Sequence, residues 1–189
     1  MTIKIGVLVG SLRKESFSRK IAKALVVLAP QEAQLEIVEI GELSLYNQDF
    51  DDEGRPPAGW TTFRESMKQY DAFLFVTPEY NRSVPAVMKN AIDIGSRPFS
   101  ENVWNGKPGA VVSVSPGSIG GFGANHHLRQ SLVVLNVPVM PLPESYIGNV
   151  AALLDDSGAV TNEKTHRLLQ KFMEGFVNWT LANAPSPIR

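Results

Sequence analysis

Short apolar runs alternate along the chain with longer stretches in which apolar residues recur at helical spacing. The first run, Ile3–Val9, ends at Gly10, and Pro30 ends the helical pattern that follows, formed by Phe17, Ile21, Ala24, Leu25 and Leu28. An apolar run bounded by glycine is typical of a buried strand, and apolar residues three or four apart are typical of a helix. The sequence therefore predicts a strand, a loop and a helix at the start of the chain.

The same alternation continues to the end of the chain. Further strands are predicted at residues 35–40, 72–76, 110–114 and 137–140, while residues 41–59 and 141–161 are predicted to be mostly irregular. The remaining helices are predicted from four apolar stripes: Trp60, Phe63, Met67 and Tyr70; Met88, Ala91 and Ile92; Leu128, Leu132 and Leu135; and Leu168, Phe172, Phe176 and Trp179, the last within residues 162–182. Strands alternating with helices predict an α/β fold with a parallel sheet covered on both faces. The strand order 2-1-3-4-5 would bring the loops after the first, third and fourth strands side by side.

Composition narrows the class of protein. The 189 residues, 43% of them hydrophobic, suit one domain spanning residues 1–189. The net charge of -1 gives no field that would favour nucleic acid or an anionic membrane, and no apolar run approaches a membrane span. The absence of cysteine excludes disulfides and thiolate chemistry, and the first strand leaves no room for a secretory signal. We therefore expect a cytoplasmic protein.

The loop after the first strand carries the hydroxyls of Ser11, Ser16 and Ser18 and the guanidinium of Arg13. Free backbone N–H groups at a helix amino end attract anions, and hydroxyls add donors. The loop lacks both Gly-x-Gly-x-x-Gly and Gly-Lys-Ser/Thr, so it fits neither a dinucleotide fingerprint nor a P-loop. It is interpreted as a phosphate cradle; the alternative is a helix capped by Ser16 or Ser18 with surface hydroxyls left over.

Two further loops follow buried strands. Residues 78–81, Pro-Glu-Tyr-Asn, offer an aromatic face and amide groups to a planar ring, although a simple turn with Asn81 in the left-handed region would also explain the asparagine. Residues 115–123 contain four glycines, which allow a close approach to a ligand or, alternatively, make a mobile surface loop. His126 and His127 are neighbours on a helix and cannot share one metal ion, so neither a metal site nor a catalytic side chain is predicted.

Three blocks of sequence resemble the NADPH-dependent FMN reductase family, which has the flavodoxin-like fold and includes quinone, chromate and azo-dye reductases. The blocks are residues 10–20, residues 78–97 and the segment from Gly120 to Gln130, and the resemblance covers roughly residues 3–141. Two departures are visible. Ser18 stands where the family usually has asparagine, and Ile94-Gly95 stands where a bulkier, often aromatic residue is common.

The resemblance implies noncovalent FMN, NADPH or NADH as reductant, and a homodimer or tetramer. It implies that the phosphate and ribityl end is held by Ser11, Arg13, Ser16, Phe17 and Ser18. The isoalloxazine would meet Pro78, Glu79, Tyr80 and Asn81, and its other side Ser115, Gly117, Gly120 and Gly121. Arg82 and Arg97 are candidates for the nucleotide. Glu79 and Arg97 are also the charged residues expected near the ring; the alternative for each is an ordinary interface ion pair.

The expected activity is a two-electron, ping-pong reduction of quinones, with chromate, azo compounds and ferric chelates as further acceptors. The flavin would carry the hydride, which fits the lack of acid–base residues. The alternatives are a flavodoxin-type electron carrier, a flavin reductase that releases reduced FMN, and a non-catalytic interaction protein that kept the fold. The near-neutral net charge argues against the carrier, because such carriers are usually strongly acidic.

Overall fold

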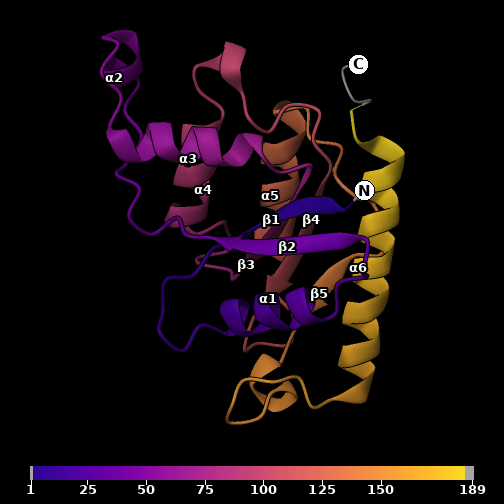
Figure 1. The fold of residues 1–189 in the computed structure, drawn as a ribbon. Helices are drawn as coiled ribbons and strands as arrows, with labels where there is room; N and C mark the ends of the chain where they lie inside the picture. The colour runs from indigo at the N-terminus through magenta and orange to yellow at the C-terminus, as the bar shows by residue number, and fades with distance from the viewer. Residues whose placement is uncertain (1, 186–189) are drawn as a thin grey trace.

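A computed structural model describes residues 2–185 and shows a central sheet with helices on both faces (Figure 1). The order of elements in these residues is β1 (Ile3–Val9), α1 (Phe17–Val27), β2 (Ala33–Val38), α2 (Gln48–Asp52), α3 (Ala58–Lys68), β3 (Ala72–Thr77), α4 (Ala86–Gly95), η1 (Phe99–Glu101), β4 (Gly109–Val114), α5 (Phe122–Val134), β5 (Ser145–Ile147), η2 (Val150–Leu153) and α6 (Glu163–Asn183).

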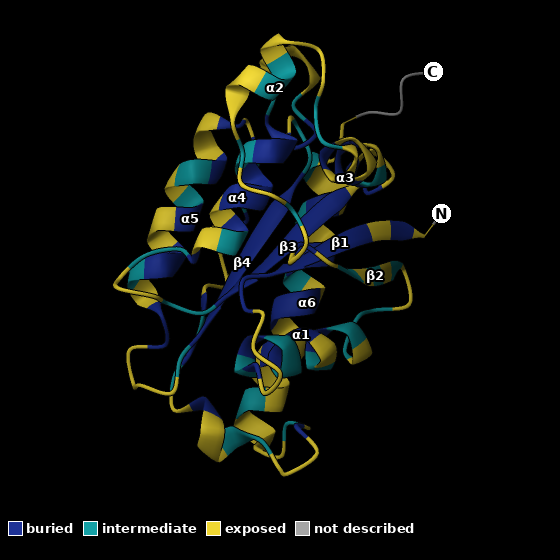
Figure 2. Ribbon diagram, turned by 90° about the vertical axis from the view of Figure 1, so that its left-hand side faces the viewer, coloured by how far each residue is buried: buried dark blue, intermediate teal, exposed yellow. Residues whose placement is uncertain are grey.

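The five strands are parallel and lie in the order β2-β1-β3-β4-β5, as the sequence predicts. The register pairs Val9 with Val76 and Thr77 with Ser113. The strands β1, β3 and β4 therefore end at the same edge of the sheet. Their burial on both faces, visible in Figure 2, matches their nearly continuous apolar sequences.

The predicted fifth strand at residues 137–140 is wrong. Within that segment Val139 makes only an isolated bridge to Gly109, and the strand that pairs with β4 is Ser145–Ile147. Pro138 has no N–H to donate, and Pro141 and Pro143 follow closely, so a regular ladder cannot continue there. The sheet is completed a few residues later, where Ser145 pairs with Val112.

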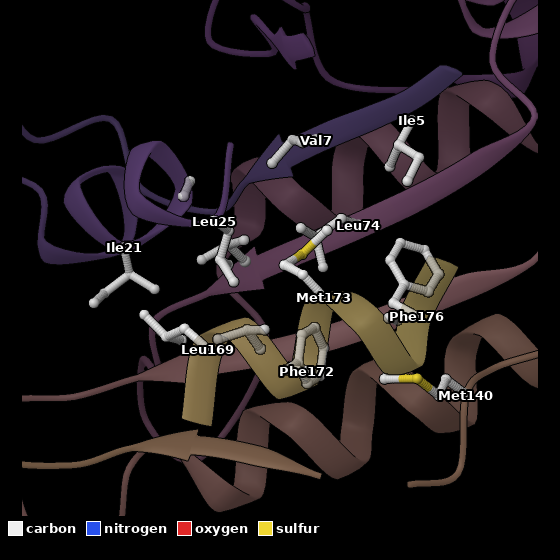
Figure 3. Packing of buried hydrophobic residues seen from close by; sticks show 14 of the residues in the cluster. Ile5, Val7, Ile21, Leu25, Leu74, Met140, Leu169, Phe172, Met173 and Phe176 are labelled. Carbon is white, nitrogen blue, oxygen red and sulfur yellow. The ribbon is translucent and has the colours of Figure 1, made fainter. Parts of the chain in front are cut away.

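Two hydrophobic cores lie on opposite faces of the sheet. On one face, Figure 3 shows Ile5, Val7 and Leu74 of the strands packed against α1 and α6. On the other face α3, α4 and α5 cover Leu8, Phe73 and Phe75, with Trp60 and Trp104 fully buried. The strands that carry the three loops are therefore packed against helices on both faces of the sheet.

The buried stripe of α6 differs by one position from the predicted stripe. Leu168 is 41% exposed, whereas Leu169, Phe172, Met173 and Phe176 are fully buried. Two apolar residues stand side by side at 168 and 169, and helical periodicity alone does not select between them. Although α6 is 21 residues long, no helix in residues 2–185 is long and apolar enough to cross a membrane.

The predicted loop at residues 41–59 contains α2 and the start of α3, and it is fixed to the body of the protein. The buried Asn90 side chain accepts a hydrogen bond from Tyr46 N (2.8 Å) and donates to the carbonyls of Leu43 and Ser44 (both 3.1 Å). This amide satisfies three backbone groups of residues 43–46, which have no regular secondary structure. The segment is therefore an ordered part of the fold.

Candidate functional site

The three loops predicted to bind a ligand meet at the carboxyl edge of the sheet. Gly10 N donates to Val76 O (2.9 Å), and an added Cβ at Gly10 would lie 3.2 Å from Pro78 Cδ. Across β4, a Cβ at Gly121 would lie 3.6 Å from Glu79 Cβ. The loop after β3 therefore touches both of its neighbours. Ligands of doubly wound sheets bind at this edge.

The first loop offers side-chain donors and the backbone N–H groups at the start of α1. Ser11 and Ser18 are 6% and 2% exposed, and in the part of the chain that the structure describes neither hydroxyl has a protein hydrogen-bond partner. Arg13 is exposed and belongs to no ion pair of the described residues. The first turn of α1 contains no acidic residue, so no carboxylate of that turn offsets the positive end of the helix dipole. These features suit an anion.

Two other residues of this region, Ser16 and Phe17, have structural roles. Ser16 is the N-cap of α1, and its hydroxyl accepts a hydrogen bond from Arg19 N at 3.1 Å, so the capping alternative accounts for this serine. The half-buried ring of Phe17 packs against the core formed with α1 and α6. Their predicted contacts with a cofactor remain predictions, whereas their roles in the fold are visible.

The second loop forms a tight turn. Tyr80 N donates to Ser83 O (3.1 Å) and Ser83 N donates to Tyr80 O (3.0 Å), with φ of 50° at Asn81 and 63° at Arg82. Two successive residues with positive φ are the geometry of a type I′ turn. The turn explains Asn81, as the simple alternative proposed, but it also leaves the Tyr80 side chain 47% exposed at the carboxyl edge. An exposed ring on a stiff turn is available to a planar ligand.

The carboxylate of Glu79 points to the neighbouring helix. Its Oε2 accepts a hydrogen bond from Ala124 N in the first turn of α5 (3.0 Å), and its Oε1 accepts one from Arg82 Nη1 (3.0 Å). The side chain is only 12% exposed. Glu79 therefore connects the second loop to the third, and its two oxygens are engaged within the protein.

The third loop is fixed along its length to residues 146–150. Ser115 N donates to Ile147 O (2.9 Å), and Asn149 N donates to Gly117 O (3.1 Å). Gly120 has φ of 66°, and an added Cβ would lie 2.8 Å from the carbonyl carbon of Tyr146. Gly120 is thus required by packing within the protein. Gly117 is different, because a Cβ there would have only Ser115 Oγ nearby, at 3.5 Å.

Arg82 lies with the three loops and Arg97 does not. Arg82 occupies the turn of the second loop, and its side chain is 72% exposed. Arg97 follows the far end of α4, where Nη1 donates to Ser96 O and Oγ (3.3 and 3.1 Å) and the guanidinium lies over Phe99. Since α4 has ten residues and rises about 1.5 Å per residue, Arg97 is about 15 Å along the helix from the loops of its own chain.

Comparisons with known proteins identify the family of the chain. The sequence model of the NADPH-dependent FMN reductase family matches residues 3–152. The chain belongs to this family. It is 59% identical to a quinone reductase of Pseudomonas putida over 179 residues, covering 95% of each chain.

Solved structures support the same assignment. The structure of FerB, a flavoenzyme NAD(P)H:(acceptor) oxidoreductase from Paracoccus denitrificans, has a TM-score of 0.90 and 38% identity, with 97% of this chain and 100% of that chain covered. A flavodoxin mutant from Pseudomonas aeruginosa has a TM-score of 0.56 at 17% identity, covering 93% of this chain and 99% of its own, which shows the flavodoxin-like fold alone. This family member is an FMN-dependent NAD(P)H oxidoreductase.

The residues at the carboxyl edge fit FMN. A terminal phosphate needs several donors and a positive potential, which the α1 amino end, Ser11, Ser18 and Arg13 supply. Ser18, where the family usually has asparagine, offers a hydroxyl donor in place of an amide N–H donor. The exposed face of Tyr80 and the open surface at Gly117 lie on the two loops predicted to hold the ring. When bound, FMN supplies the hydride and electron chemistry that this site lacks among its side chains.

Several residues of the site were not predicted from the sequence. Ala124 contributes its backbone N–H to Glu79, and the only sequence signal is that Gly-Gly-Phe-Gly begins a helix without a Ser, Thr, Asp or Asn cap. Beside the third loop, Phe122, His126 and Tyr146 form an aromatic cluster, with His126 Nε2 3.1 Å from Tyr146 Oη. Burial raises the pKa of Tyr146 to about 12, and its hydrogen bond to Glu144 acts in the same direction.

Proposed function

We propose that this protein catalyses the two-electron reduction of quinones by NADPH or NADH, using FMN held by the loops after β1, β3 and β4. The observation that carries the proposal is the direct contact of these three loops at one sheet edge, through the Gly10–Pro78 and Glu79–Gly121 approaches. The 59% identity to a quinone reductase supports quinones as the acceptor class. Chromate, azo compounds and ferric chelates are proposed as further acceptors.

Different residues of the chain would bind the phosphate, the ring and the nucleotide. Ser11, Ser18 and the α1 amino end would hold the phosphate, and Arg13 would add a charge that neutralises it. Pro78 and the Tyr80–Ser83 turn would form one wall beside the ring, while Ser115 and Gly117 would form the other. Arg82 is the candidate for nucleotide contact from the same chain. The role of Arg97 remains a prediction.

We also propose that the protein is a homodimer, with a tetramer as the larger alternative. A surface cavity of about 500 Å³ lies next to the second loop, lined by Ser83, Val84, Lys89, His127, Gln130, Ser131 and Val134. Val133 and Val134 at the end of α5 are 68% and 71% exposed, and a second copy would cover them. We propose a cytoplasmic location as well. Light scattering of the purified protein measures the mass, and cell fractionation measures the location.

The decisive experiment combines binding with turnover. FMN should stay bound through dialysis, and NADPH or NADH should be oxidised steadily when a benzoquinone is added. Riboflavin, which lacks the phosphate, should bind much more weakly than FMN, and this preference should shrink in R13A and S11A. Loss of reduced FMN into the dialysate would favour a flavin reductase, and no turnover by the FMN-loaded protein would favour an electron carrier. A protein that does not bind FMN would contradict the proposal.

A further inference from the structure

Helix α5 begins without a cap of its own. Its N-cap is Gly121, with φ of 75°, and its first turn contains no acidic residue. The first N–H groups of a helix have no partner within the helix, and an Asn, Asp, Ser or Thr side chain at the N-cap normally satisfies one of them. Glycine has no side chain to do so. The free N–H groups at this end of α5 therefore need partners from outside the helix, such as water or a side chain from another part of the protein.

Glu79 provides such a side chain. Its Oε2 accepts a hydrogen bond from Ala124 N, the third residue of α5. At the same position of α6, Thr165 N donates to the side chain of the N-cap Asn162 at 2.9 Å. A carboxylate at a helix amino end is also stabilised by the helix dipole. Unlike Asn162, however, Glu79 belongs to a different loop, 45 residues away in the sequence.

The packing around this contact leaves little freedom. A Cβ at Gly123 would lie 2.9 Å from Glu79 Oε2 and 2.9 Å from Arg82 O, so the glycine of the first turn lets the second loop lie directly on α5. The second carboxylate oxygen binds Arg82 in the Tyr80–Ser83 turn. One side chain therefore fixes the backbone of the second loop and the start of the helix that follows the third.

We propose that Glu79 is a positioning residue: its carboxylate caps α5 from the neighbouring loop and so sets the spacing between the two loops that hold the flavin ring. This role rests on the FMN site proposed above and differs from a direct contact with the ring. Glu79 is flanked by Pro78 and Tyr80. A change in the contact between Glu79 and Ala124 would therefore move both proposed ring contacts. The site then depends on Glu79 through geometry.

The test compares E79A, E79D and E79Q with N162A, which removes the cap at the same helix position of α6; Asn162 belongs to none of the three loops. Both E79A and N162A should lower the Tm of the apoprotein by about 2–4 °C. Only E79A should also raise the Kd for FMN by about fivefold or more and change the visible circular dichroism of the bound flavin. E79Q keeps an oxygen acceptor and should stay within about twofold of wild type. E79D retains the charge but is one methylene too short, so it should behave like E79A.

Amide hydrogen exchange gives a readout that needs no flavin. In the apoprotein, Ala124 and residues 78–83 should exchange faster in E79A and E79D than in wild type or N162A. An FMN Kd and flavin spectrum unchanged in both E79A and E79D would overturn the positioning role, as would unchanged exchange at Ala124. If E79A does not fold, the contrast between E79D and E79Q decides. Failure of the wild type to bind FMN would instead contradict the proposed FMN site, because the exchange result does not depend on it.

Discussion

The indole ring of Trp104 lies directly against Gly95, so closely that a Cβ at Gly95 would be 2.5 Å from Trp104 Cζ2. Trp104 is fully buried, and its Nε1 donates to Ile92 O at 3.0 Å. The departure from the family pattern at Ile94-Gly95 therefore has a structural reason. The space beside the end of α4 is filled by an aromatic side chain from a later segment.

G95A should reduce stability through overpacking. The new methyl group would meet a ring that is held by its hydrogen bond and by Phe73 and Phe63, so the free energy of unfolding should fall by about 1–3 kcal/mol. Urea denaturation measures the change. G59A is the matched control: Gly59 lies in helix α3 with nothing within 4 Å of its added Cβ, so it should be neutral or stabilising. Equal stabilities for G95A and wild type would contradict the packing argument.

Breaking the Arg64–Asp51 ion pair should be costly. Both side chains are nearly buried, at 9% and 7% exposed, with Arg64 Nη2 2.7 Å from Asp51 Oδ2 and Arg64 Nε 2.9 Å from Ile94 O. Removing one partner leaves a buried charge unpaired, so R64A should lower the free energy of unfolding by about 3–5 kcal/mol. E65A, on the same helix, breaks an exposed pair with Lys68 and should cost less than about 1 kcal/mol. Similar losses in the two variants would show that burial does not matter here.

Stability should rise with pH between about 8 and 10 because of Lys107. Burial lowers the pKa of Lys107 to about 8, while its Nζ donates to Met67 O at 2.9 Å. Over this range the folded protein loses the proton while the unfolded chain, with an ordinary lysine pKa near 10.5, still holds it. Stability increases with pH wherever the unfolded state binds more protons. Urea unfolding at pH 7.5 and 9.5 should show this gain in wild type and a smaller one in K107M; the same gain in both would assign it to another group.

Substitutions at Gly120 and Gly117 of the third loop should affect stability differently. G120A forces a side chain into the left-handed region and against Tyr146, so it should lower Tm clearly. G117A has room within the protein and should leave Tm nearly unchanged. If Gly117 lies beside the flavin as proposed, G117A should weaken FMN binding all the same. Wild-type FMN affinity in G117A would place the ring away from this glycine.

Most helices and strands are predictable from the sequence because they depend on local periodicity, and the order 2-1-3-4-5 is one of the common orders of doubly wound sheets. The fifth strand is predicted in the wrong place because residues 137–140 have the apolar composition of a strand. Pro138 within that segment and the prolines after it argue against a strand there, and the pairing of Ser145 with β4 shows where the strand lies. Likewise the sequence predicts Glu79 as a residue of the site, but the missing cap at Gly-Gly-Phe-Gly does not show that the backbone N–H of Ala124 is its partner. Contacts made by backbone groups are decided by the three-dimensional arrangement of the loops.

The two edge strands of the sheet are poor partners for a strand of another molecule. One edge is β5, only three residues long, and the other is β2, whose partly buried apolar residues alternate with the exposed Gln34 and Glu36. Short strands and charged side chains at an edge discourage pairing with a further strand. Growth of the sheet from one molecule into the next is therefore disfavoured at both ends. The three loops at the carboxyl ends of β1, β3 and β4 therefore stay clear of any sheet that would continue from one molecule into the next.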